Sequence, residues 1–169
     1  MTTFLITGGN TGIGLSTATA LARDGGRVFI ACRSAAAGAA AVERIRSESG
    51  SADVRLLMLD LASLSSVRAG AAEFLALDEP LHVLVNNAGV GGQRGISADG
   101  FELHFAVNHL GHFALTQLLL DRLAASGGSG ARIVNVSSEA HHGARGINFD
   151  AVRRRTATFT GAREYAVSK

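Results

Sequence analysis

The sequence predicts an α/β fold in which a doubly wound parallel sheet carries helices on both faces. Two observations support this prediction. Short aliphatic or β-branched runs alternate with longer segments of helical periodicity throughout the 169 residues. Nearly all of these short runs are continuously apolar, as is typical of strands in a parallel sheet that helices cover on both sides. In such a fold the ligand site lies at the carboxyl ends of the strands.

The alternation begins at the N-terminus and continues through most of the chain. Gly25 and Gly50 follow the first two predicted helices as stop signals. We expect strands at residues 4–7, 28–32, 54–59, 81–85 and 133–136. We expect helices at residues 12–25, 35–49, 64–77 and 99–125, with a flexible connection at 126–130. There is no internal repeat, and the length suits one domain over residues 1–169.

Composition narrows the class of protein. Hydrophobic residues make up 47% and charged residues 18% of the chain, so it can bury a sizeable core. The basic run Arg153-Arg154-Arg155 has no interleaved aromatic residues, so the net charge of +2 does not indicate nucleic-acid binding. A lone cysteine, Cys32, excludes an intrachain disulfide. Because there is no signal-peptide pattern and the apolar run at 113–120 is too short to span a bilayer, we expect a soluble cytoplasmic protein.

A glycine-rich loop follows the first predicted strand. It reads Thr7-Gly8-Gly9-Asn10-Thr11-Gly12-Ile13-Gly14. Gly8 permits a tight exit from the strand, Gly12 lets the backbone approach a pyrophosphate, and Gly14 allows the helix to pack closely on the sheet. The N–H groups at the start of the helix then face the anion. A purely structural turn is the alternative, but the position between strand and helix favours a phosphate loop with candidate cofactor ligands Gly8, Asn10, Thr11, Gly12, Ile13 and Gly14.

The ends of the next strands add candidate cofactor residues. Arg33 stands after the second strand, where an acidic residue would accept a hydrogen bond from a free ribose 2′-hydroxyl. An arginine there favours a 2′-phosphate, so we expect NADP(H) over NAD(H), unless Arg33 is simply a solvated loop residue. Asp60 and Leu61 follow the third strand and could hold the adenine edge, or Asp60 could cap the next helix. The fourth strand ends in a run that suits either ribose contacts or hydrogen bonds across the sheet, namely Asn86-Asn87-Ala88-Gly89.

Taken together, the motifs resemble the short-chain dehydrogenase/reductase family along the whole chain. The resemblance also includes Asn108 in the long helix, Val136-Ser137-Ser138 after the fifth strand, and Tyr165-x-x-x-Lys169. The stretches 105–113 and 132–138, with a long gap before Tyr165, are similar to the retinol-dehydrogenase-like subgroup. The resemblance implies a single Rossmann-type NAD(P)-binding domain and an NADP(H)-linked oxidoreductase. It also implies a carbonyl or alcohol substrate, often large and apolar.

The resemblance implies four catalytic residues: Ser138, Tyr165, Lys169 and Asn108. Hydride transfer needs a group that gives or takes the alcohol proton, and Tyr165 is the candidate. Lys169 lies four residues on, on the same helical face, where its charge favours the phenolate; by resemblance it also holds the nicotinamide ribose. Ser138, rather than its neighbour Ser137, would hydrogen-bond the substrate oxygen. Asn108 would hold a water of a proton relay, and it could equally satisfy backbone groups as a buried amide.

Other constellations fit the sequence less well. Ser138 has His141 and His142 nearby, but the nucleophile-elbow pattern G-x-S-x-G is absent. His109 and His112 lie about one helical turn apart, but there is no third ligand at suitable spacing, so we expect no metal.

Family members continue beyond the tyrosine–lysine motif, at which this sequence ends. We therefore expect a sheet that is incomplete on its C-terminal side, an exposed fifth strand, and an isolated 169-residue chain that is nearly inactive. A catalytically silent nucleotide-binding or interaction fragment is the alternative. By resemblance, the full-length form would be a homodimer or tetramer that uses the helix at 99–125.

Overall fold

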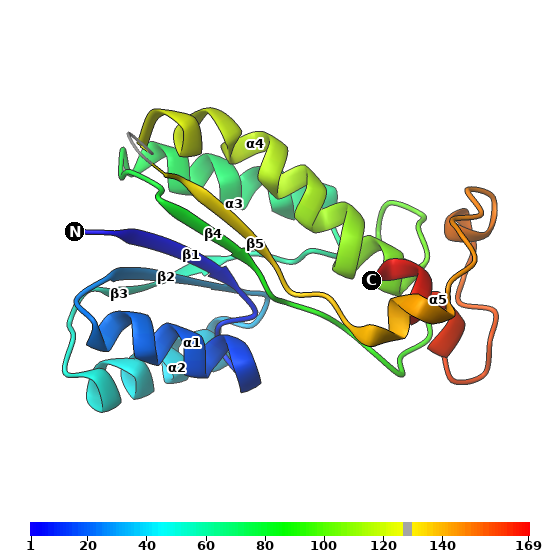
Figure 1. Cartoon of the computed structure of the whole chain (residues 1–169), viewed down its shortest axis with the longest axis horizontal. Coiled ribbons are helices and arrows are strands. Elements are labelled where there is room, and N and C mark those ends of the chain that lie inside the picture. The colour runs from blue at the N-terminus through cyan, green and yellow to red at the C-terminus, as the bar shows by residue number, and fades with distance from the viewer. Residues whose placement is uncertain (127–129) are drawn as a thin grey trace.

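In the computed structural model, which describes residues 1–126 and 130–169, five strands form one parallel sheet (Figure 1). The strands are β1 (Thr3–Thr7), β2 (Arg27–Cys32), β3 (Val54–Met58), β4 (Val83–Asn86) and β5 (Arg132–Asn135). Their order across the sheet is β3-β2-β1-β4-β5. The chain therefore winds from β1 outwards to β3, returns to the middle, and continues the other way through β4 and β5. The predicted doubly wound fold is confirmed.

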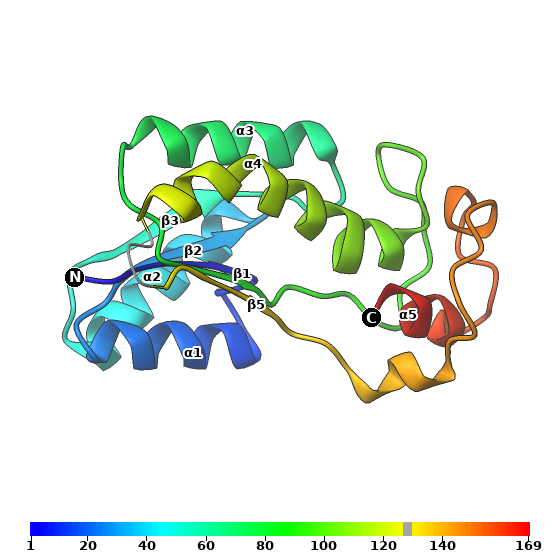
Figure 2. The ribbon, with the colours of Figure 1, turned by 45° about the horizontal axis from the view of Figure 1, so that its top comes forward.

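Helices cover both faces of this sheet (Figures 1 and 2). On one face lie α1 (Gly12–Arg23) and α2 (Ala35–Ser49), and on the other α3 (Leu64–Ala76) and α4 (Gly111–Ser126). Side chains alternate along the strands, so Leu5 packs in the core with Phe74 and Leu119, whereas Ile6 packs with Ala18 and Ile45. This alternation explains the uninterrupted apolar runs, because every position of a central strand faces a helix.

Two helix starts follow from short polar side chains. Ser34 accepts a hydrogen bond from Ala37 N, and Ser63 accepts one from Ser66 N. Asp60 is therefore not the cap of α3. Its carboxylate instead accepts from Ala62 N at 2.9 Å and shapes the turn between β3 and α3.

The helix predicted at 99–125 begins later than expected. Residues 97–101 form a turn closed by Ser97 N donating to the Phe101 carbonyl, and Gly100 has a φ of 79°, which a helix does not allow. Asp99 accepts from Leu64 N at 2.7 Å and so belongs to the start of α3. The helical segment is also interrupted by a wider π-turn, η1 (Phe105–Leu110), directly before α4.

The predicted connection at 126–130 starts where α4 ends, at Ser126, and residues 127–129 lie outside the described part of the chain. Beyond it, β5 is one of the two edge strands of the described sheet, with Ile133 and Val134 exposed by 41% and 44%. Past β5 the chain forms a lobe of short elements at the carboxyl end of the sheet, η2 (Glu139–Gly143), η3 (Ala151–Arg153) and α5 (Ala162–Ser168) (Figure 1). Among the described residues, no helix combines the length and apolarity needed to cross a bilayer.

Candidate active site

The glycine-rich loop lies where the winding direction of the sheet changes, between the carboxyl ends of β1 and β4. Gly8 donates from its N–H to the Ala31 carbonyl at 2.8 Å, and a Cβ on Gly8 would stand 2.9 Å from Ala88 Cα. A Cβ on Gly14 would stand 2.4 Å from the Gly8 carbonyl oxygen. The first turn of α1 thus packs directly against the loop. A larger residue at Gly8 or Gly14 would force the loop away from its neighbours.

The outer side of this loop has the properties of an anion site. Gly12 has a φ of 53°, and the space where its Cβ would stand is open. Thr11 caps α1 without a side-chain hydrogen bond, and the first turn contains no acidic residue. The N–H groups at the start of α1 are therefore available to an anion, and the positive end of the helix dipole favours one. These residues fit a dinucleotide pyrophosphate. Arg33 is exposed just beyond the end of β2.

The amides after β4 hold the strands together. The Thr7 hydroxyl accepts from Asn87 N and Ala88 N, each at 3.0 Å, and the Asn87 side chain donates to the Thr7 carbonyl at 2.8 Å. Asn86 donates to the Asn135 side chain on β5 at 2.8 Å. Of the two interpretations of this run, hydrogen bonding across the sheet is present. The backbone of Ala88 lies directly beside Gly8 of the glycine loop, and Gly89 follows it in the chain.

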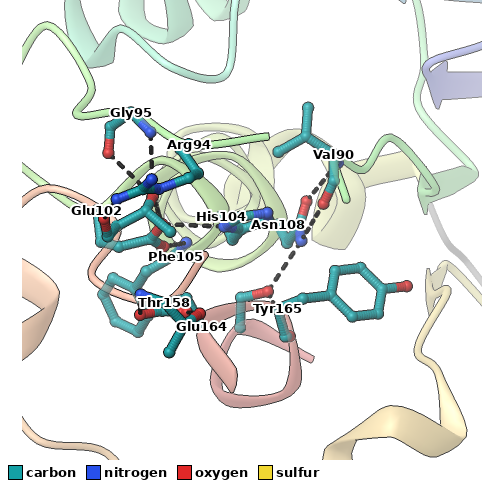
Figure 3. A network of polar contacts seen from close by, with 12 residues as sticks. Val90, Arg94, Gly95, Glu102, His104, Phe105, Asn108, Thr158, Glu164 and Tyr165 are labelled. Carbon is teal, nitrogen blue, oxygen red and sulfur yellow. Dashed lines mark hydrogen bonds and ion pairs between the residues drawn. The ribbon is translucent and has the colours of Figure 1, made fainter. Parts of the chain in front are cut away.

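Asn108 lies in the π-turn η1 and braces the loop after β4. Its Oδ1 accepts from Val90 N at 2.8 Å, and its Nδ2 donates to the Val90 carbonyl at 3.0 Å (Figure 3). The same Nδ2 donates to Ser168 Oγ at 2.8 Å. Ser168 in turn donates to the Tyr165 carbonyl at 2.7 Å. Asn108 is partly buried, and its amide satisfies the backbone of Val90 in the loop after β4 and not backbone groups of its own helix. Through Ser168 this amide also links the π-turn to α5.

Tyr165 and Lys169 lie together, as the four-residue spacing predicts. Lys169 Nζ is 5.8 Å from the centroid of the Tyr165 ring and donates to the Val136 carbonyl at 3.2 Å. A Cβ on Gly89 would be 3.3 Å from the same Nζ. The ammonium thus stands at the carboxyl ends of β4 and β5, next to Gly89.

Ser138 follows β5 and begins η2, which packs against α5. Its hydroxyl oxygen accepts from Ala140 N at 3.2 Å. His141 contacts the carbonyl of Ser138 and not its hydroxyl, which argues against a serine–histidine nucleophile. Ser137 instead donates from its hydroxyl to the Lys169 carbonyl at 3.0 Å.

A residue that the sequence did not single out for this role joins the two halves of the site. His112 is 6% exposed, with Nε2 2.8 Å from the Thr7 hydroxyl and Nδ1 3.1 Å from the Asn108 carbonyl. Because the Asn108 carbonyl can only accept, His112 donates from Nδ1, and its Nε2 accepts from the Thr7 hydroxyl, which also lies 3.4 Å from the Val85 carbonyl. Burial lowers the pKa of His112 to about 4, with the positive charges of Lys169 and His109 acting in the same direction. The signal in the sequence was the four-residue spacing from Asn108.

A second group was also not anticipated. Glu102, His104 and Thr156 are buried and form a hydrogen-bonded cluster, and the His104 ring lies against Tyr165. Within the described part of the chain, no group of histidine, cysteine and carboxylate side chains is arranged to hold a metal ion.

This fold, with a glycine loop at the switch point and a tyrosine–lysine pair beyond the carboxyl ends of β4 and β5, is that of the Rossmann-type dehydrogenases. The sequence profile of the family described as short chain dehydrogenase matches residues 2–149. The chain belongs to this short-chain dehydrogenase/reductase family, whose members are oxidoreductases that bind a nicotinamide cofactor.

Within the family, the chain is retinol-dehydrogenase-like. It is 52% identical to bovine (Bos taurus) retinol dehydrogenase 12 over 139 residues, which cover 82% of this chain and 43% of that protein. It is 46% identical to human retinol dehydrogenase 13 over 168 residues, covering 99% of this chain and 50% of that protein. The chain therefore spans about half the length of the curated relatives it matches.

Solved structures share the fold of the chain. An uncharacterised protein from Mycobacterium paratuberculosis superposes with a TM-score of 0.81 at 38% identity, covering 100% of this chain and 57% of that one. The active-site complex of Pseudomonas aeruginosa RhlG with NADP gives a TM-score of 0.73 at 31% identity, covering 90% of this chain and 60% of that one.

Proposed function

We propose that this chain supplies the cofactor site and the catalytic residues of an NADP(H)-dependent oxidoreductase that interconverts a carbonyl compound and an alcohol. The observation that carries the proposal is the position of Lys169 Nζ, 5.8 Å from the Tyr165 ring and directly beside Gly89. The ammonium thereby stands at the carboxyl ends of β4 and β5 with the phenol ring beside it, at the same end of the sheet as the glycine loop, whose free N–H groups fit a pyrophosphate.

The cofactor would bind on the glycine loop, in contact with Gly8, Asn10, Thr11, Gly12, Ile13 and Gly14. Asp60, Leu61, Asn87, Ala88 and Gly89 would line the same site. When bound, its nicotinamide supplies or accepts the hydride. Tyr165 gives its proton to the carbonyl oxygen in reduction and takes the proton back in oxidation. The nearby charge of Lys169 stabilises the phenolate that this transfer leaves.

Ser138 and Asn108 have supporting roles. We assign the Ser138 hydroxyl, which keeps its own proton while accepting from Ala140 N, to a hydrogen bond with the substrate oxygen. Asn108 uses both N–H groups and one lone pair on Val90 and Ser168. One lone pair of its Oδ1 is left for the water that would connect Lys169 to solvent.

The preference for NADP(H) depends on Arg33, and RhlG, a structural relative, was solved with NADP. The test is a fluorescence titration of the 169-residue chain with NADPH and with NADH. We expect Arg33→Ala to weaken NADPH binding about 10- to 100-fold, as loss of a charge-assisted contact does, and to change NADH binding little. The matched control is Arg68→Ala on the exposed side of α3. Equal affinity of the unaltered chain for both nucleotides would overturn the preference.

The catalytic assignment has its own test. Relatives named retinol dehydrogenase and polyprenol dehydrogenase direct the choice of substrate to long apolar alcohols and their aldehydes. The full-length protein should consume NADPH when such aldehydes are added. Tyr165→Phe should abolish this consumption, because it removes the proton that Tyr165 transfers. NADPH binding without any turnover by the full-length protein would instead favour the silent nucleotide-binding alternative.

We further expect a cytoplasmic homodimer or tetramer for the full-length form.

A further inference from the structure

A cluster of polar side chains is buried immediately behind the proposed proton donor. Glu102, His104 and Thr156 are exposed by 3%, 0% and 2%. They come from different segments, because Glu102 and His104 precede η1 whereas Thr156 lies in the loop before α5. Buried polar groups are costly unless they are hydrogen-bonded, so the pattern of bonds shows what the cluster holds.

The Glu102 carboxylate is the centre of the cluster. One oxygen accepts from the Thr156 hydroxyl and from His104 Nδ1, 2.9 Å away, and the other accepts from Phe105 N at 2.9 Å. Three hydrogen bonds, from three different residues, thus hold this carboxylate in place. Thr156 also accepts from Gly95 N at 3.0 Å, so the cluster fixes the start of the π-turn and two loops at once.

His104 extends this arrangement to α5. Because Nδ1 donates to Glu102, the imidazole is held in one orientation. Its far side packs on Gly161, the N-cap of α5, where a Cβ would stand 2.6 Å from His104 Cε1. The ring also stands edge-to-face against Tyr165, with centroids 6.3 Å apart and planes at 81°. Both the N-cap of α5 and the Tyr165 ring therefore contact His104.

We propose that the Glu102–His104 pair is a positioning unit for Tyr165. The carboxylate sets the orientation of the imidazole, and the imidazole sets the position of the phenol ring and of the helix that carries it. This role rests on the proposed function, in which Tyr165 transfers the proton. It differs from a purely structural role because it acts on Tyr165 in the folded protein, whatever its effect on overall stability.

The composition of the chain makes this measurable. Tyr165 is the one tyrosine and there is no tryptophan, so intrinsic fluorescence reports on Tyr165 alone. Loss of a hydrogen bond to a charged group shifts such an ordering equilibrium by roughly tenfold or more. We therefore expect Glu102→Gln to raise the constant for acrylamide quenching of Tyr165 at least about twofold and to lower its fluorescence anisotropy. Glu73→Gln, an exposed change on α3, should have no effect.

Further variants separate positioning from loss of fold. Circular dichroism and urea unfolding establish which variants are folded at the temperature of the quenching experiment. Thr156→Val removes one donor to Glu102 and should shift quenching in the same direction by less, whereas Thr156→Ser keeps the hydroxyl and should match the unaltered chain. His104→Phe keeps an aromatic ring without the N–H. Its effect and that of Glu102→Gln should be non-additive in the double variant, because both break the same bond.

The proposal is overturned if folded Glu102→Gln and Thr156→Val variants leave the quenching and anisotropy of Tyr165 unchanged. Since the fluorescence test contains no cofactor, it is independent of the proposed function. A shift in quenching without NADPH binding would refute the function and leave the positioning role. NADPH binding with unchanged quenching would do the reverse.

Discussion

Lowering the pH should destabilise the fold through His112, because this imidazole is buried and neutral in the native state. Desolvation, reinforced by the charges of Lys169 and His109 and opposed by the hydrogen bond to the Asn108 carbonyl, lowers its pKa from 6.5 to about 4. Between these two values the unfolded chain binds a proton that the folded chain does not. The free energy of unfolding is therefore at its full value above the unfolded pKa and falls as the pH drops towards the folded one.

The size of the effect follows from the shift. At 1.36 kcal/mol per pKa unit the full difference is about 3 kcal/mol, and roughly 2 kcal/mol of it should be lost between pH 7 and pH 5. The assay is urea unfolding followed by circular dichroism at several pH values in that range. The perturbation is His112→Asn, whose side chain cannot titrate. In this variant the fall of the unfolding free energy between pH 7 and pH 5 should be smaller by those roughly 2 kcal/mol. The lost hydrogen bonds of His112 lower the stability of the variant at every pH.

The comparison rests on slopes and not on absolute stabilities. His142→Asn, at an exposed histidine in η2, is the control and should leave the slope of the unaltered chain in place. The same slope in His112→Asn as in the unaltered chain would refute the account, because another group would then be responsible for the loss of stability.

Two further substitutions test the architecture of the site. Gly14→Ala should abolish NADPH binding in the cofactor titration, since its Cβ would stand 2.4 Å from the Gly8 carbonyl oxygen, whereas Ser16→Ala on the exposed side of α1 should bind normally. Tight binding by Gly14→Ala would show that the loop does not cradle the pyrophosphate. Asn108→Ala should lower the urea-unfolding free energy by about 2–4 kcal/mol, because it removes three hydrogen bonds and leaves the Val90 backbone without partners. A loss no larger than that of Gln117→Ala, an exposed change on α4, would contradict the bracing role of Asn108.

Most of the sheet and its helices could be predicted because their signals are local. The apolar run Phe4–Thr7 and the loop that ends in Gly14 identify a strand, a turn and a helix start without reference to the rest of the chain. The start of the long helix could not be predicted in the same way. Asp99 and Gly100 follow a helical pattern in the sequence, but the carboxylate of Asp99 is drawn to the first turn of α3, 35 residues away.

The candidate site shows the same division. Tyr165 and Lys169 could be paired from their spacing, since one turn of helix brings them together, and the pairing is present between α5 and its C-cap, Lys169. The preference of Arg33 for a phosphate and the catalytic role of Ser138 stay predictions. The sequence alone does not show whether a histidine contacts the Ser138 hydroxyl, as a serine nucleophile would require. The structure shows that His141 contacts the carbonyl oxygen of Ser138 instead.

By itself the sequence determined the order of strands and helices, the position of the glycine loop and the identity of the motif residues, because each depends on neighbours within one or two turns. Only the tertiary structure decided which groups are buried together. Thr7 and His112 meet across 105 residues, and Glu102 and Thr156 across 54. Such contacts leave no periodic trace, since they arise from the closing of long loops around a shared core, and it is in that core that burial lowers the pKa of His112 and fixes His104 against Tyr165.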